Sequence, residues 1–538
     1  MLSTILRINI VSVRFHWPIK YLPALLLVLF ICAPLCAQKK LPAPERVVSD
    51  CVKALGGKKR LAGIRDATYD YELLREGQRT GRARTQIKTN TFARTEMVFD
   101  DAREILSGSN GRSAWERGTD GHLNTLTDAL GNTAKLRGTL DASRLLDYKK
   151  LDVLARMVGL ETLAGEPAYV LEFSSRNGAR LRYWFGVSSH LLLKITDDVR
   201  QTETSFADYR ASGGIVEPHR LEIRGKDAEA QILVLQKASY NTGLFAALFD
   251  PPAAATSSAE ALNIPALLRE LELNQKKIDE RVAEYYFLEK RTEREINSRG
   301  EVTKEKVSVY EVYPLVGSSP IHKLISEDGV PLNAERAARR DKEIAEFVTK
   351  YEHEREKKVQ KSEELKNRGE AEKKKDDDDE IGINLFLRAC EFVSPRREQR
   401  GEREAVVFDF RPREGFRPRT QAESIVSKLA GIMWIDPFEK VVVRLEARLA
   451  ESFKVGGGLV ASISPGSAFA FEQVRQPDGV WLPRFAQVNF KARVLLFKGL
   501  EANETREYND YKRFNAEASG YQLEAPKSEQ SVPAKPKP

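Results

Sequence analysis

Apolar and polar residues alternate in short runs along most of the chain, as is typical of strands with one buried face. The clearest runs are "AYVLEF" (168–173) and "AVVFDF" (405–410), both rich in β-branched and aromatic residues. Helix-like segments precede the two strand-rich stretches, at "APERVVSDCVKALGG" (43–57) and "IPALLRELELNQKKIDERVAEY" (264–285). Because strands follow one another without intervening helices, the pattern predicts antiparallel meanders and an α+β fold.

Several segments of the first half have counterparts in the second half, in the same order. "GGIVEPHRLEI" (213–223) corresponds to "DGVWLPRFAQV" (478–488), and "RYWFGVSSHLLLKI" (182–195) to "IMWIDPFEKVVVRL" (432–445). "AYVLEF" and "AVVFDF" form a third pair. The matches predict a tandem duplication, although two β-rich halves can also share Gly-x-x-x-Pro hairpins by chance.

The first of these pairs carries a hairpin pattern. Gly214 and Gly479 suit turns that require a positive φ, because glycine has no Cβ. Pro218 and Pro483 cannot donate to a strand ladder, so each should lie at a strand start or at an edge. The segments "GVSS" and "DPFE" are expected to form further hairpin turns.

Composition changes along the chain suggest the domain bounds. We expect a first domain over 38–250, a linker over 251–263, a second domain over 264–524 and a disordered tail over 525–538. The second domain carries a charged insert, 335–380, whose first half has helical spacing.

The N-terminus has the features of a secretory signal peptide. Basic residues precede the apolar run "YLPALLLVLFICAPLCA", and Ala37 offers a small residue for cleavage. Removing residues 1–37 removes three basic residues and no acids, so the net charge falls from +8 to +5. We therefore expect export to the periplasm, and the mild basic excess serves either solubility or contact with anionic lipid at a membrane such as the outer membrane.

Candidate chemistry is sparse. No histidines or cysteines have metal-ligand spacing and no catalytic or phosphate-binding motif occurs, so we predict no metal site, cofactor or catalytic residue. Basic and acidic residues are mixed, which argues against nucleic-acid binding. Cys51 and Cys390 remain after cleavage; sequence allows one bridge, but two buried small apolar residues fit their surroundings better.

The first half resembles the outer-membrane lipoprotein-sorting family, the LolA/LolB-like fold. The resemblance rests on a helix ending in Gly-Gly, a Gly-x-x-Ala-Trp hairpin, a strand pair and a Gly-x-x-x-Pro hairpin, found in "KALGGKKRLAGI" (53–64), "GRSAW" (111–115), "GEPAYVLEF" (165–173), "YWFGVSSHLLLKI" (183–195) and "YRASGGIVEPHRLEI" (209–223). The second half keeps only the later segments. The resemblance implies two tandem open half-barrels of curved antiparallel sheet, each with helices on the concave side and an apolar space for acyl chains.

Strand alternation provides candidates for the lining of such cavities. Tyr183 and Phe185 should share one strand face and Trp184 the other; Val443 should share a face with Leu445. Ordinary core packing is the alternative for each aromatic residue. The full candidate set is Tyr183, Trp184, Phe185, Phe408, Phe410, Trp434, Val443 and Trp481.

The leading hypothesis is a periplasmic, non-enzymatic protein that binds a lipid or lipoprotein acyl chain as carrier or holder. The alternative is an envelope sensor or scaffold that docks a protein partner through residues 335–380. A hydrolase that uses an unrecognised carboxylate pair is a third hypothesis.

Overall fold

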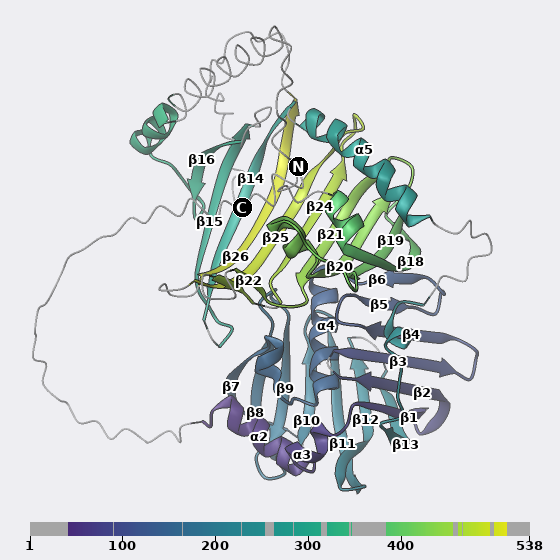
Figure 1. Cartoon of the computed structure of the whole chain (residues 1–538). Helices are drawn as coiled ribbons and strands as arrows, with labels where there is room; N and C mark the ends of the chain where they lie inside the picture. Colours follow the sequence, from purple (N-terminus) through teal and green to yellow (C-terminus); the bar gives the residue numbers. More distant parts are fainter. Residues whose placement is uncertain are drawn as a thin grey trace, which may run out of the picture.

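The computed structural model arranges the chain in two large antiparallel sheets (Figure 1). The described residues are 41–89, 91–163, 165–226, 229–252, 263–282, 284–297, 299–313, 320–343, 346, 383–455, 461–464, 466–494 and 500–513. The predicted signal peptide, the C-terminal tail, most of the linker and most of the charged insert therefore lie outside the described residues.

The first sheet is built from residues 66–240. Its strands are β1 (Asp66–Arg75), β2 (Gln78–Lys88), β3 (Phe92–Phe99), β4 (Glu104–Ser109), β5 (Ala114–Arg117), β6 (Leu123–Thr125), β7 (Leu154–Leu163), β8 (Glu166–Ser174), β9 (Arg180–Gly186), β10 (Leu192–Asp197), β11 (Thr202–Ser212), β12 (Ile215–Gly225) and β13 (Gln231–Tyr240). The helices of this half are α2 (Pro44–Ala54), α3 (Lys58–Ala62), α4 (Asp128–Ser143) and the short 3₁₀ turns η1 (Tyr148–Leu151) and η2 (Ala246–Phe249).

The second sheet is built from residues 285–513. Its strands are β14 (Tyr285–Ile296), β15 (Val302–Tyr313), β16 (Ile321–Glu327), β17 (Val330–Pro331), β18 (Cys390–Arg400), β19 (Arg403–Pro412), β20 (Leu429–Asp436), β21 (Val441–Leu449), β22 (Phe453–Val455), β23 (Ala461–Ile463), β24 (Ala468–Arg475), β25 (Trp481–Val494) and β26 (Leu500–Arg513). Helices α5 (Ile264–Val282), α7 (Ile383–Ala389) and α8 (Gln421–Val426) accompany it. Residues 335–343 at the start of the charged insert are helical, as predicted for its first half.

The two sheets have the same strand order over most of their width. In the first, β1 pairs with the last strand, β13, and the order is β6-β5-β4-β3-β2-β1-β13-β12-β11-β10-β9-β8-β7. In the second, β14 pairs with β26 in the order β17-β16-β15-β14-β26-β25-β24-β21-β20-β19-β18. The strand pairs in both sheets are antiparallel, and both sheets are open. The antiparallel, sheet-dominated fold is therefore confirmed. The half-barrel shape, the domain bounds and the common origin by duplication stay predictions.

The segments matched from the sequence lie at equivalent places in this order. The turn at Gly213–Gly214 joins β11 to β12, and the turn at Gly479 joins β24 to β25. The "GVSS" and "DPFE" segments join β9 to β10 and β20 to β21, as antiparallel hairpins.

The two hairpin prolines also behave alike. Pro218 pairs with Tyr209 on one side, while β13 begins to pair only at Arg220. Pro483 pairs with Gln473, while β26 begins to pair only at Phe485. Each proline thus occupies a stretch where its strand has a single neighbour, the setting in which a sheet tolerates a residue without an N–H. The expected edge position is confirmed in this local sense.

Each sheet packs its own helices onto one face. Leu136 and Leu140 of α4 join Val48 of α2 in the core of the first half. In the second half, Leu268 of α5 and Phe386 of α7 enter the corresponding core. No helix among the described residues is long and apolar enough to cross a membrane.

Both remaining cysteines are free and buried, so the expectation of small apolar residues is confirmed. Cys51 lies in the first core and Cys390 in the second. Burial raises the pKa of each thiol to about 12, which keeps both thiols protonated and unreactive at neutral pH.

One predicted strand face is wrong. Val443 packs with Trp434 and Ile432, whereas Leu445 belongs to the core on the opposite face. The register of β20 and β21 shifts between Trp434 and Ile435, so that Arg444 and Val442 face consecutive residues of the partner strand. Such a bulge inserts one residue and reverses the alternation beyond it.

Candidate functional site

The eight residues predicted to line ligand cavities are core residues or nearly so. Tyr183 and Phe185 lie in the first core, and Phe408 and Phe410 in the second, all at most 1% exposed. Trp184 lies on the opposite face from Tyr183 and Phe185, as the alternation predicted.

The three tryptophans also have fixed environments. The indole N–H of Trp184 donates to Glu161 at 2.8 Å, and that of Trp481 donates to Glu439 at 2.6 Å. Trp434 is buried with Ile432 and is partly covered by Val443. None of the eight residues lines the cavity between the two sheets that is described below. Their proposed contact with a ligand stays a prediction.

A buried polar network joins the two sheets at the β6–β18 edge. Arg396 of β18 donates from Nη2 to the Thr125 hydroxyl of β6 at 2.6 Å and from Nε to Glu398 at 2.8 Å. Glu398 in turn accepts from the Thr125 backbone N–H at 3.1 Å. Arg396 is 1% exposed, so its hydrogen bonds to Thr125 and Glu398 replace those to water that its guanidinium has lost.

Asp409 extends this network toward the β4–β5 hairpin. It accepts from Ser113 at 2.8 Å and from Asn110 at 3.2 Å, and it pairs with Arg396 at 3.2 Å. Its side chain is fully buried. We use the name inter-sheet network for Asn110, Ser113, Thr125, Arg396, Glu398 and Asp409.

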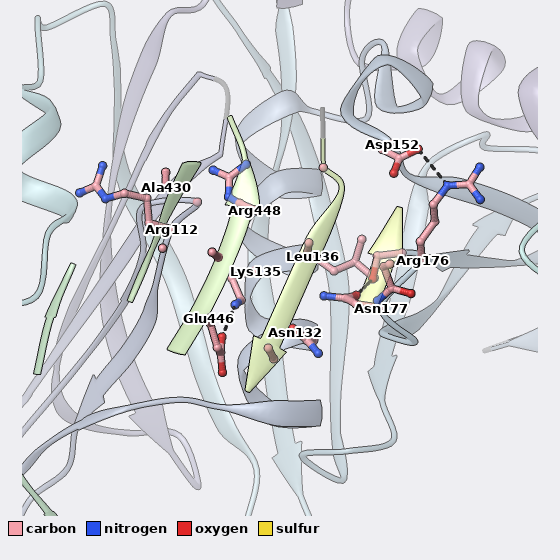
Figure 2. Close-up of a pocket in the computed structure, with 18 of the residues that line it drawn as sticks. Arg112, Asn132, Lys135, Leu136, Asp152, Arg176, Asn177, Ala430, Glu446 and Arg448 are labelled. Atoms are coloured by element: carbon pink, nitrogen blue, oxygen red, sulfur yellow. Dashed lines mark hydrogen bonds and ion pairs between the residues drawn. The ribbon is translucent and has the colours of Figure 1, made fainter. Parts of the chain in front are cut away.

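A cavity of about 370 Å³ lies beside the inter-sheet network, between α4 and the second sheet (Figure 2). Its wall on the first half includes Asn132, Leu136 and Thr139 of α4. Strands β20, β21, β24 and β25 supply the opposite wall, with small residues such as Ala430 and Ala468. In Figure 1, α4 stands between the two sheets, which explains why one helix forms a wall of both the first core and the cavity.

Three charged residues of β21 point into this space from alternate positions. Arg444 is buried and pairs with Asp128 of α4 at 2.7 Å and with Glu446 at 2.8 Å. Glu446 also pairs with Lys135 of α4 at 3.4 Å. These pairs link the second sheet to α4.

Arg448, the third of these residues, has no such partner. Its Nε is buried without a hydrogen bond, and no ion pair to it occurs within the described part of the chain. Burial and the nearby Arg112 lower the pKa of Arg448 to about 10. The guanidinium therefore stays charged at neutral pH without a counter-charge.

Opposite Arg448, the cavity is lined by a paired arginine, Arg176. Arg176 binds Asp152 at 3.3 Å and Glu501 at 3.0 Å, and its carbonyl accepts from Asn503 at 2.8 Å. Figure 2 shows Arg176 and Asp152 on one side of the pocket, and Arg448 and Arg112 on the other. The cavity thus has a neutralised end and a positively charged end.

Sequence reasoning missed this site because its walls come from both halves. A strand "VVVRLEARL" with a charge at every second position reads as a strand with one exposed face. The alternation of Arg444, Glu446 and Arg448 was the available signal, but nothing local indicated that α4 covers that face. No group of three metal-ligating residues occurs in the described part of the chain.

The chain has structural likeness to several solved proteins. A DUF1329 family protein from Desulfovibrio piger is 14% identical over 38% of this chain and 96% of its own, with a TM-score of 0.27. A LolA superfamily protein from Nitrosomonas europaea is 15% identical over 37% of this chain and 96% of its own, with a TM-score of 0.26. The MucA/MucB complex of Pseudomonas aeruginosa matches at 10% identity over 86% of this chain and 94% of that chain, with a TM-score of 0.16.

No protein-family model and no curated protein matches the sequence. One of these structures comes from the LolA superfamily, to which the resemblance stated from the sequence also refers. Nothing about ligand, activity or partner follows from these likenesses.

Proposed function

We propose that this is an exported, non-enzymatic binding protein that holds a lipid or acylated ligand between its two sheets. The cavity beside the inter-sheet network carries this proposal, because both halves contribute to its wall. Its volume of about 370 Å³ is within the range of small-molecule sites. That volume suits a head group with the start of an acyl chain better than a complete two-chain lipid.

The lining of the cavity matches an amphiphilic ligand. Leu136, Leu151 and Phe469 provide apolar surface, while Arg448 and Asn132 provide polar groups within the same space. Polar side chains with apolar surface beside them can bind the two parts of an amphiphile. The cores of the two sheets are filled by their own side chains, which leaves the space between the sheets as the better chamber.

Native mass spectrometry of residues 38–538, purified from the native periplasm and then extracted with organic solvent, tests the proposal. We expect one extractable amphiphile per chain. An Ala470→Trp substitution, which places an indole in the cavity, should remove it. An Ala211→Trp substitution on exposed β11 should leave it bound.

A bare polypeptide mass for the wild-type chain, unchanged by added phospholipid, would contradict the proposal. It would favour the second candidate function, a scaffold that docks an envelope protein. The filled cores of both sheets are compatible with a scaffold that works without a ligand. Deletion of residues 335–380 should then abolish capture of that partner while the cavity is untouched.

A further inference from the structure

Two arginines on one strand have opposite surroundings. Arg444 is held by Asp128, Glu446 and Glu472. Arg448 lies four residues further along β21, on the same face, and has no carboxylate partner in the described chain. The two residues therefore share a strand, a face and a cavity wall and differ in counter-charge.

The neighbours of Arg448 leave room beside its guanidinium. The residues that pair with it on β20 and β24 are Ala430 and Ala468, which carry only a methyl group each. The backbone at Gly111 approaches from the β4–β5 turn, where an added Cβ would lie 3.3 Å from Nη2 of Arg448. A side chain on Gly111 would thus compete for the space next to the guanidinium.

Arg112 lies near this guanidinium and, as a second cation, cannot neutralise it. Arg112 lines the same cavity and pairs with Asp250 at 2.6 Å and, more loosely, with Asp409 at 3.5 Å. Both carboxylates are thereby committed to other partners. Burying the Nε of Arg448 without a hydrogen bond is costly, and an anion that accepts a hydrogen bond from it would recover that cost.

We propose that Arg448 forms an oxyanion subsite at the positively charged end of the cavity, which binds the phosphate group of a ligand. The group belongs either to a lipid head group or to a small soluble phosphate. The fork of the guanidinium matches two oxygens of a phosphate. This inference deepens the proposed function, on which it rests for the lipid source of the phosphate.

Calorimetric titration of the mature protein (38–538) with inorganic phosphate, in a phosphate-free chloride buffer, tests the subsite. We expect binding by the wild-type chain and a loss of roughly tenfold or more in affinity for Arg448→Gln, as for other hydrogen bonds to a charged group. Lys150→Gln is the matched control, because Lys150 lines the same cavity but is exposed and paired with Asp147. Its phosphate affinity should stay within about twofold.

A second titration, with the short-chain lipid dihexanoyl phosphatidylglycerol, distinguishes the two sources. Tighter binding than inorganic phosphate, lost in Arg448→Gln, assigns the site to a lipid head group. Equal binding of both probes assigns it to a small soluble anion. If Arg448→Gln does not fold, Arg448→Lys provides the measurement, with weaker phosphate binding expected because the fork is lost.

The proposal is overturned if neither probe binds the wild-type chain, or if the Arg448 variants and Lys150→Gln bind phosphate equally well. These outcomes are separable from failure of the proposed function. If an amphiphile is extracted but phosphate binding does not depend on Arg448, only the subsite is rejected. Phosphate binding that depends on Arg448, without any extractable lipid, would reject only the lipid ligand.

Discussion

The two faces of the second sheet are both buried, but by different means. One face carries Phe408 and Phe410 and is covered by α5, α7 and α8 of the same half. On β19, Asp409 lies between these two residues and therefore points to the other face, where it meets Ser113 and Asn110 of the first half. The first face is buried by apolar contacts. The part of the second face around Asp409 is buried by ion pairs and hydrogen bonds.

The difference shows which kind of burial specifies the arrangement of the two halves. Apolar side chains tolerate many partners of similar volume, so apolar contacts alone do not determine how the two halves are oriented. Arg396, Glu398 and Thr125 accept only one geometry, since each buried polar atom must meet a matching group. The inter-sheet network therefore orients the two sheets and with them the walls of the cavity.

The largest expected effect comes from breaking this network. Asp409→Leu removes the carboxylate that faces Arg396, while that guanidinium is 1% exposed. We expect the free energy of unfolding to fall by about 3–5 kcal/mol, since a buried charge loses its partner. Urea titration followed by tryptophan fluorescence measures it.

Glu451→Gln provides the control for this variant. Glu451 is 75% exposed and lies 3.7 Å from Lys428, so its loss should cost at most about 1 kcal/mol. A similar loss of stability for both substitutions would show that the inter-sheet network does not hold the halves together.

A buried charge also occurs within the second sheet alone. It allows the stability that comes from charges inside one half to be measured separately from the stability that comes from the inter-sheet network. Glu289 of β14 is 2% exposed. Although burial raises its pKa, His322, Arg291 and Arg506 lower the pKa of Glu289 to about 2, from an ordinary value of 4.5. The ionised carboxylate therefore stabilises the fold above about pH 4.5, and this contribution is lost as the pH falls toward 2.

We expect Glu289→Gln to cost about 3 kcal/mol at neutral pH and progressively less below pH 4.5. Urea titrations of wild type and variant at several values of pH measure the difference. A difference in the free energy of unfolding between wild type and variant that stays constant from pH 7 to pH 3 would contradict the low pKa of Glu289. Because all three partners lie in the second half, this loss should leave the contact between the halves intact.

The sequence predicted the parts of this molecule that depend on local order. Alternation identified the strand runs, and the matched hairpins at Gly214 and Gly479 indicated two units with equivalent strands. Sequence could not predict the cavity or the inter-sheet network, because their residues lie far apart in the chain and meet only when both sheets have formed. The prediction for the strand face of Val443 was wrong for a local reason. A β-bulge leaves no clear pattern in a strand of nine residues.

The smallest expected effect concerns the apolar face. Phe408→Leu keeps an apolar side chain of reduced volume in a core that α7 and α8 cover. We expect a loss of about 1 kcal/mol in the free energy of unfolding, because neighbouring side chains can partly fill the space. Unfolding in urea measures the loss, and the extracted ligand per folded chain should match the wild type. A lost ligand in a stably folded Phe408→Leu protein would place the ligand inside the second core, as the sequence alone suggested, rather than between the sheets.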